Sequence, residues 1–297
     1  MSNPVFAEFK KIFTDNNAVK VFIAANVVVF LAINLVLLAF FLMGISEATI
    51  DLTRFLAVPS AIGSFLSRPW TIITYMFLHL GFFHLFFNML ILYIGGRIFT
   101  EYLGDKNLIS TYFVGGIVGA LFYIAAFNLF PGFERMVSAS VALGASASVI
   151  AILVGAATYV PNYTLNLLLI GPIRLKYIVI FLLVVDLISI RQENPGGHIA
   201  HLGGAFYGYI FVSQYKQGRN IALWFNKLAD YIATLFKPKS NLKVAYTSKR
   251  KTDEEYNVMK AESQQRIDII LDKISKSGYE SLTKEEKEFL FNASKNL

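Results

Sequence analysis

Residues 20–44 read KVFIAANVVVFLAINLVLLAFFLMG, and Lys20 is the only charged residue among them. A helix that crosses the hydrocarbon core of a bilayer needs about 20 mostly apolar residues, so this stretch is long enough. Met1 to Lys20 is mixed and amphipathic, and the apolar run after it is too long for the apolar region of a cleavable signal peptide. We therefore expect a transmembrane helix that stays in the mature protein.

Five further apolar runs follow this first one. Residues 45–79 separate the first two runs and contain Asp51, Arg54 and Pro59, so we expect a structured loop at the membrane interface. The fourth and fifth runs are separated by an apolar segment that Gly171-Pro172 interrupts. The sequence thus predicts an all-α membrane domain of six spans over residues 20–215, the later five at roughly 80–103, 109–130, 142–160, 174–190 and 198–215.

The composition also indicates a membrane protein. Hydrophobic residues make up 55% of the chain and charged residues 16%, with a mean hydropathy of +0.53, whereas soluble domains carry about 25% charged residues. Sixteen of the 27 Lys and Arg lie in residues 215–297. A basic segment directly after a span is typical of the cytoplasmic side, so we expect no nucleic-acid partner. The absence of cysteine excludes disulfides, thiol catalysis and cysteine-ligated metals.

Lys and Arg in short loops predict the orientation of the spans. With six spans both termini lie on the same side of the membrane, and the loops on that side carry more Lys and Arg than the loops on the other side. We therefore expect a multi-pass membrane protein with cytoplasmic termini, with spans two, four and six starting on the opposite side. The basic residues on the expected cytoplasmic side are Lys10, Lys11, Lys20, Arg97, Lys106, Arg174, Lys176, Lys216 and Arg219.

The regions outside the spans carry no recognisable chemistry. Residues 1–19 would form a cytoplasmic N-terminal segment, and residues 216–252 an amphipathic segment (Ile221–Phe236) followed by a basic linker. Residues 253–297 predict a small cytoplasmic helical hairpin, because Thr283 and Glu286 have the spacing of a capping box. The apolar face of its first helix would comprise Ile267, Ile270, Leu271 and Ile274.

Polar residues cluster at the starts of three spans. All four histidines lie at the starts of spans two and six, and span four begins with the small-residue segment that contains Ser146 and Ser148. Under the expected orientation these starts share one side of the membrane. Polar groups inside a span are costly and indicate function. We therefore expect these clusters to meet in the outer part of the bundle.

Helical spacing selects residues within the clusters. His84 and Asn88 are four apart and share a face. Gly204 and Gly208 lie on the face of His201, where small residues permit close helix packing. Ser146 and Ser148 are separated by about 200° around a helix, so one of them at most faces a given partner. Gly144 would give the backbone room beside Ser146.

This combination points to nucleophilic catalysis. A serine hydroxyl becomes nucleophilic when a neighbouring histidine takes its proton, and the tetrahedral oxyanion then needs hydrogen-bond donors. His84, the Asn88 amide and the backbone N–H of Ser146 are available donors. Asp186 is the only carboxylate deep in a span and is not expected near these helix starts. The sequence therefore predicts a Ser-His dyad rather than a triad.

HLFFN at 84–88, GAS at 144–146 and HLGGAFYG at 201–208 together resemble the signature of rhomboid intramembrane serine proteases. Trp70 resembles the family's first-loop pattern. The resemblance is to the bacterial type of the family, which implies a bacterial cell (inner) membrane. The resemblance covers about residues 20–215 and implies a six-helix core with a water-accessible cavity, cleavage of other proteins' transmembrane segments within the lipid bilayer, and no cofactor. It implies that Ser146 is the nucleophile, His201 the general base, and His84 with Asn88 the oxyanion-binding pair.

Two positions depart from the family pattern. Ala147 follows the serine where the family usually has glycine, so we expect its methyl group to narrow the cavity. Ile150 stands one turn after the serine, where many members have an aromatic residue that packs on the histidine. We expect Ile150 to support His201 less specifically.

Other interpretations account for parts of the pattern. A serine among small residues is most often a helix-packing residue, and a histidine at a membrane boundary is often an interfacial anchor. A histidine cluster can bind metal, but we expect no metal because there is no HExxH motif and no nearby carboxylate. A transporter would show internal repeats, and none is evident. The main alternative is a catalytically inactive rhomboid-like protein that binds transmembrane clients.

Overall fold

The computed structural model describes residues 17–167, 170–192, 194–236 and 253–294. The chain divides into two compact units, Met1–Phe236 and Lys237–Leu297. Most of the expected N-terminal segment (1–19) and the part of the expected linker from 237 to 252 lie outside the described residues.

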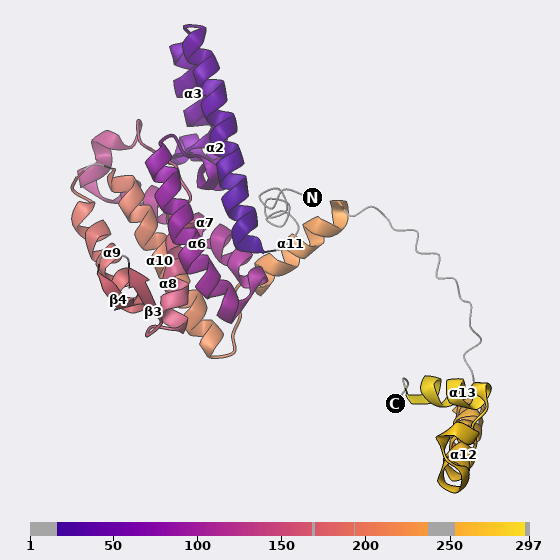
Figure 1. The fold of residues 1–297 in the computed structure, drawn as a ribbon. Helices are drawn as coiled ribbons and strands as arrows, with labels where there is room; N and C mark the ends of the chain where they lie inside the picture. Colours follow the sequence, from indigo (N-terminus) through magenta and orange to yellow (C-terminus); the bar gives the residue numbers. More distant parts are fainter. Residues whose placement is uncertain (1–16, 168–169, 193, 237–252, 295–297) are drawn as a thin grey trace. The chain divides into compact units, whose positions relative to one another are not determined.

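Six helices of the first unit match the six expected spans, and they form one helical membrane bundle (Figure 1). Among the described residues, three of them are long and apolar enough to cross a bilayer: α2, α6 and α7. The sixth, α10, has 22 residues and begins three residues before the expected span. The bounds are α2 Ala18–Leu42, α6 Phe82–Leu103, α7 Asp105–Leu129, α8 Ser146–Tyr159, α9 Leu175–Ser189 and α10 Pro195–Lys216.

Helix α8 is the centre of the bundle. It has 14 residues and is therefore about 21 Å long, shorter than the hydrocarbon core. Every residue from Ala147 to Ala157 is buried, and α8 contacts α6, α7, α9 and α10. Its apolar sequence thus reflects burial among other helices, and its first residue, Ser146, is half-buried at the start of this buried segment.

Glycines bring α10 against α8. A Cβ atom at Gly204 or Gly208 would overlap the backbone carbonyl oxygen of Ala147 or Ala151, respectively. Because backbone atoms fill this space, no side chain larger than hydrogen fits without a shift of a helix. The close packing places the start of α10, with His201, beside the start of α8.

The segment from 45 to 79 is ordered, as a structured loop requires. It contains α3 Ser46–Leu56, β1 Val58–Pro59, α4 Ile62–Ser67, α5 Thr71–Thr74 and η1 Tyr75–Phe77. Strand β1 pairs antiparallel with β2 (Val141–Ala142), which leads into α8 at Ser146. A short 3₁₀ helix, η2 (Pro131–Met136), connects α7 to β2. Helix α3 and the C-terminal part of α2 project beyond the rest of the bundle (Figure 1).

The connection between α8 and α9 differs from expectation. Its apolar sequence forms a β-hairpin, in which β3 (Thr164–Leu167) pairs antiparallel with β4 (Gly171–Arg174). Gly171 has a φ of +88°, a conformation that glycine adopts without a Cβ clash. The Gly-Pro pair that interrupts the apolar run therefore begins a strand that leads into α9.

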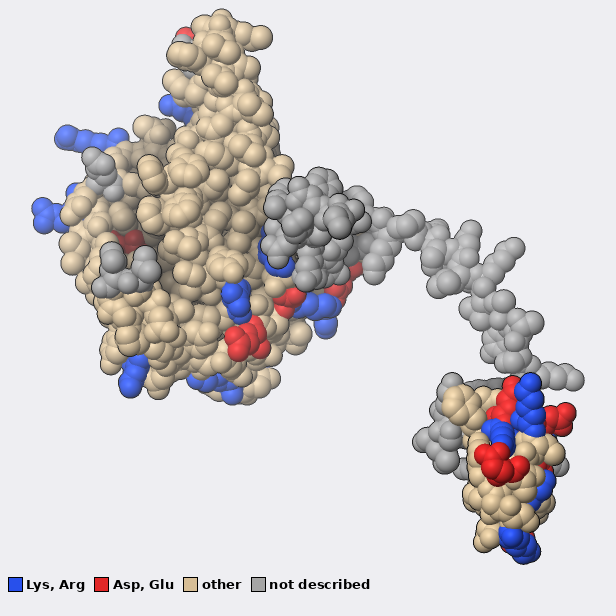
Figure 2. Space-filling view, viewed as in Figure 1, with Lys and Arg blue, Asp and Glu red and all other residues tan. Residues whose placement is uncertain are grey.

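The expected amphipathic segment after α10 forms α11, Leu223–Phe236, with Trp224 exposed. It packs on α7 within the first unit. Over α2 and α6, the face seen in Figure 2 shows almost no charged side chains, and the charged groups lie along its left and lower edges.

The second unit is a helical hairpin. It contains α12 Asp253–Ser277, η3 Tyr279–Ser281 and α13 Lys284–Ser294. The predicted capping box forms: the Thr283 N–H donates to a Glu286 carboxylate oxygen at 2.7 Å, and the Glu286 N–H donates to Thr283 Oγ1 at 3.3 Å. Ile270 is buried, as expected for the apolar face. Leu271 is exposed, so the assignment of Leu271 to that face was wrong.

Candidate active site

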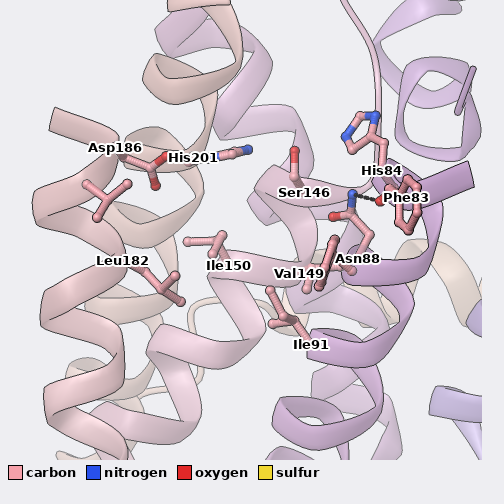
Figure 3. A pocket seen from close by; sticks show the side chains of 12 residues that line it. Phe83, His84, Asn88, Ile91, Ser146, Val149, Ile150, Leu182, Asp186 and His201 are labelled. Atoms are coloured by element: carbon pink, nitrogen blue, oxygen red, sulfur yellow. Dashed lines mark hydrogen bonds and ion pairs between the residues drawn. The ribbon is translucent and has the colours of Figure 1, made fainter. Parts of the chain in front are cut away.

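A cavity of about 340 Å³ lies between α6, α8, α9 and α10. Four of its lining residues are those that the sequence selected as catalytic or oxyanion-binding: Ser146, His201, His84 and Asn88. They come from the starts of α6, α8 and α10, and Figure 3 shows them around one space. Apolar side chains form most of the remaining wall: Phe83, Phe87, Ile91, Val149, Ile150, Leu182 and Val185.

Ser146 is the first residue of α8. The first backbone N–H groups of a helix have no intrahelical partner, and no side chain caps this end of α8. The helix dipole adds partial positive charge at the same place. The position of Ser146 therefore combines a hydroxyl with backbone donors suited to a developing negative charge.

Asp186 lies beside His201, which contradicts the expectation that no carboxylate accompanies the cluster. Asp186 Oδ1 is 2.8 Å from Nδ1 of His201, and Figure 3 shows the two side chains together at the cavity. The reason is topological. Asp186 is three residues from the end of α9, and α10 begins after a short connection, so both lie at one end of the bundle. The position of Asp186 near the end of the fifth span could have indicated this.

The same carboxylate oxygen also contacts His198. Nδ1 of His198 is 2.8 Å from Asp186 Oδ1, a contact that the sequence did not indicate. Helix α10 begins at Pro195, and Asn194 caps it by accepting a hydrogen bond from the Gly197 N–H. His198 therefore lies within the helix, one turn before His201.

His84 and Asn88 share one face of α6, as their spacing predicts. The Asn88 amide donates to the backbone carbonyl of His84 at 2.8 Å, and Asn88 is buried. Gly144 has a φ of +118°, and a Cβ atom there would lie 2.7 Å from Cε1 of His84. The space that this glycine provides is thus occupied by the His84 ring.

His79 holds the turn before Ser146, a contact that the sequence did not reveal. Its Nε2 accepts a hydrogen bond from the Ala145 N–H at 3.3 Å, and its ring centroid is 5.0 Å from that of His84. Burial lowers the pKa of His79, which precedes α6, to about 4. The neutral ring then carries its proton on Nδ1, which lies 3.4 Å from the Phe77 carbonyl oxygen.

The two departures from the family pattern have different outcomes. Ala147 is buried away from the cavity, and a Cβ atom at Gly119 of α7 would lie 2.6 Å from the Ala147 methyl group. The expectation that Ala147 narrows the cavity was therefore wrong. Ile150 does line the cavity. The polar contact to the His201 ring comes from another helix, from Asp186 of α9.

Comparison with known proteins gives matches to both units. The rhomboid domain family matches residues 66–216, which are 151 of the 297 residues. A family of unknown function, DUF6576, matches residues 250–296. The chain is also 30% identical over 161 residues to RHOMBOID-like protein 12, mitochondrial, of Arabidopsis thaliana. That match covers 51% of this chain and 48% of the relative, so the chain spans about half of the relative's length.

The rhomboid match includes every residue that lines the cavity. It also includes the glycines that join α10 to α8. Together, the helical membrane bundle and a match over half of the sequence show that this chain belongs to the rhomboid family.

Proposed function

We propose that the protein is an intramembrane serine endopeptidase that hydrolyses peptide bonds in or near transmembrane segments of other membrane proteins. The observation that carries this proposal is the single cavity lined by Ser146, His201, His84 and Asn88. Its largely apolar wall suits an apolar substrate segment, and its polar groups lie together at one end of the bundle.

Ser146 Oγ would attack the carbonyl carbon of the scissile bond while its proton passes to Nε2 of His201. A carboxylate oxygen only accepts hydrogen bonds, so the contact with Asp186 requires the proton of neutral His201 to be on Nδ1. Nε2 then has the free lone pair that a general base needs. The proposed catalytic unit is therefore Ser146, His201 and Asp186, rather than the dyad expected from the sequence.

The tetrahedral oxyanion would lie near the start of α8. The proposed donors are the Ser146 backbone N–H, the imidazole of His84 and the free N–H of the Asn88 amide. His201 then gives its proton to the leaving amine, and a water molecule hydrolyses the acyl-enzyme by the same route in reverse. None of these steps requires a cofactor.

The proposed setting is a bacterial cell membrane, with both termini in the cytoplasm and the cavity opening toward the other side. The distribution of Lys and Arg among the short loops supports the proposed orientation.

The experiment is labelling of the purified protein with a serine-reactive fluorophosphonate, followed by mapping of the modified residue. We expect the label on Ser146, and we expect Ser146→Ala to lose both labelling and cleavage of a transmembrane substrate. Ser148→Ala is the matched control, because Ser148 is buried and does not line the cavity. Folded protein with an unlabelled Ser146 and no cleavage would instead support an inactive rhomboid-like protein that binds transmembrane clients.

A further inference from the structure

Three metal-ligand atoms converge beside the cavity. Asp186 Oδ1, His198 Nδ1 and His201 Nδ1 all lie within 4.8 Å of one another, the one such group among the described residues. The proposed catalytic steps use Asp186 and His201 but give no role to His198. Two imidazole nitrogens and one carboxylate oxygen are a ligand set that Zn²⁺ binds in proteins, with water in the fourth position.

The distances suit this ion after small side-chain shifts. Zinc–ligand bonds of about 2.0–2.2 Å in a tetrahedron place ligand atoms roughly 3.3 Å apart. Each imidazole Nδ1 is 2.8 Å from the carboxylate oxygen. The two contacts to oxygen would lengthen by about half an ångström, and the nitrogen–nitrogen separation would close by at most about 1.5 Å.

The three ligand side chains are accessible to an ion, and the helices that carry them hold them in place. The side chains of His198 and His201 are 21% and 22% exposed, and that of Asp186 is 9% exposed. Asp186 and His201 also line the cavity, which provides a route for water. The ligands come from two neighbouring helices, α9 and α10, so the packing of the bundle preorganises them.

We propose that Asp186, His198 and His201 form a Zn²⁺ site that switches the protease off; the inhibitory part rests on the proposed function. Zinc binds the lone pair of Nδ1 in each imidazole, which requires the ring to be in its Nε2–H tautomer. The single ring proton of neutral His201 moves through water from Nδ1 to Nε2 when Nδ1 binds the ion, and Nε2 then has no lone pair to accept the proton of Ser146. Zinc also takes the Asp186 oxygen that otherwise orients this ring.

Binding is tested without activity, by titrating Zn²⁺ into purified Ser146→Ala protein in a calorimeter. Loss of one ligand should weaken binding at least about tenfold, since loss of a residue that only hydrogen-bonds to a metal ligand already costs about 10–100-fold. Ser146→Ala/His198→Ala should show this loss. Ser146→Ala/His84→Ala is the control, because His84 lines the cavity but is not one of the three ligands. Equal affinity with and without His198 would overturn the site.

Inhibition is tested on active protein, by following fluorophosphonate labelling of Ser146 against Zn²⁺ concentration. We expect labelling to fall with a midpoint near the measured Kd and to recover with EDTA. For His198→Ala, normalised to its own zinc-free rate, the midpoint should rise by the same factor as its Kd. Zinc that binds the cluster while labelling continues unchanged would overturn the switch. Protein that binds zinc but never labels, even with EDTA, would overturn the proposed function and leave the metal site standing.

Discussion

Asp186 Oδ1 lies 2.8 Å from Nδ1 of His201. The other ring nitrogen, Nε2, is the one that would act as the general base. A carboxylate in this position fixes both the tautomer and the orientation of the imidazole and stabilises the imidazolium that forms during catalysis.

The first prediction is that Asp186→Leu lowers the rate of Ser146 labelling and kcat at least about tenfold, a part of the 10²- to 10⁴-fold that a positioned base contributes. The labelling rate and kcat of Asp186→Asn should lie between those of the wild type and Asp186→Leu, since asparagine keeps an acceptor oxygen without the charge. KM should change less than kcat, because substrate contacts remain. Asp230→Asn, at an exposed carboxylate that pairs with Lys106 on α7, is the control. Wild-type labelling in Asp186→Leu would show that a dyad suffices.

The oxyanion pair gives a second prediction. Loss of one donor typically costs about 10²–10³ in turnover. Asn88→Ala should cost less than this, because His84 and the backbone N–H of Ser146 remain. His84→Ala should cost more than Asn88→Ala, since its ring also fills the space beside Gly144. The measurement is kcat for a model transmembrane substrate in detergent. Unchanged turnover in both variants would make the two residues structural.

The glycine contacts give a third prediction. Gly204→Ala places a Cβ atom against the backbone carbonyl of Ala147, and overpacking of this kind costs about 1–3 kcal/mol. We expect a lower thermal midpoint and slower labelling, because α10 carries His201 away from Ser146. Gly63→Ala is the matched control, since a Cβ atom there meets nothing within 4 Å. A Gly204→Ala protein as stable and as active as Gly63→Ala would contradict the close packing.

The C-terminal hairpin gives a prediction about pH. The Lys273 side chain beside Glu286, together with the Thr283 N–H, holds the pKa of that carboxyl below its usual range. A depressed folded-state pKa contributes stability that is present above the unfolded pKa and is lost as the pH falls through the folded one. Hydrogen exchange of α13, corrected for the intrinsic pH effect, should therefore show less protection near pH 4 than at pH 7.

Glu286→Gln should reduce this pH dependence, because the titrating carboxyl is gone. Glu285→Gln is the control, since Glu285 lies in the same first turn without a hydrogen-bond partner in the described part of the chain. Equal pH dependence in wild type and Glu286→Gln would show that this pair does not couple the hairpin to pH.

The sequence was sufficient to predict the helices and the polar groups that meet at the cavity. Six long apolar segments fall on six helices, and the sequence-selected residues Ser146, His201, His84 and Asn88 line one cavity. This worked because span length and helical spacing are local properties that a single sequence contains. The capping box of the hairpin was predictable for the same reason.

The contacts that sequence reasoning missed are those between helices. The sequence placed Asp186 deep in a span and away from the histidines. In the structure Asp186 is three residues from the end of α9, level with the histidines of α10. Ala147 was assigned to the cavity from its neighbour Ser146, but successive helical residues point about 100° apart. The β3–β4 hairpin was missed because a short apolar run does not distinguish strand from helix.

The last prediction concerns the C-terminal regions. Truncation after Phe236 removes the whole second unit and should leave both the labelling of Ser146 and the thermal midpoint unchanged. Truncation after Gln217 also removes α11 and the residues before it, which pack on α7. Asn220 donates to the Asn107 side chain at 3.0 Å, and Ala222 is fully buried. The exposed Lys106–Asp230 ion pair contributes little to stability, so the stability lost in this truncation comes mainly from the apolar surface that is no longer buried. We expect this shorter protein to melt at a lower temperature but still to label. Asn107 lies in the first turn of α7, next to the end of α6, and the helix starts that line the cavity are at the opposite end of the bundle. Loss of labelling in folded protein truncated after Phe236 would show that the second unit belongs to the catalytic unit.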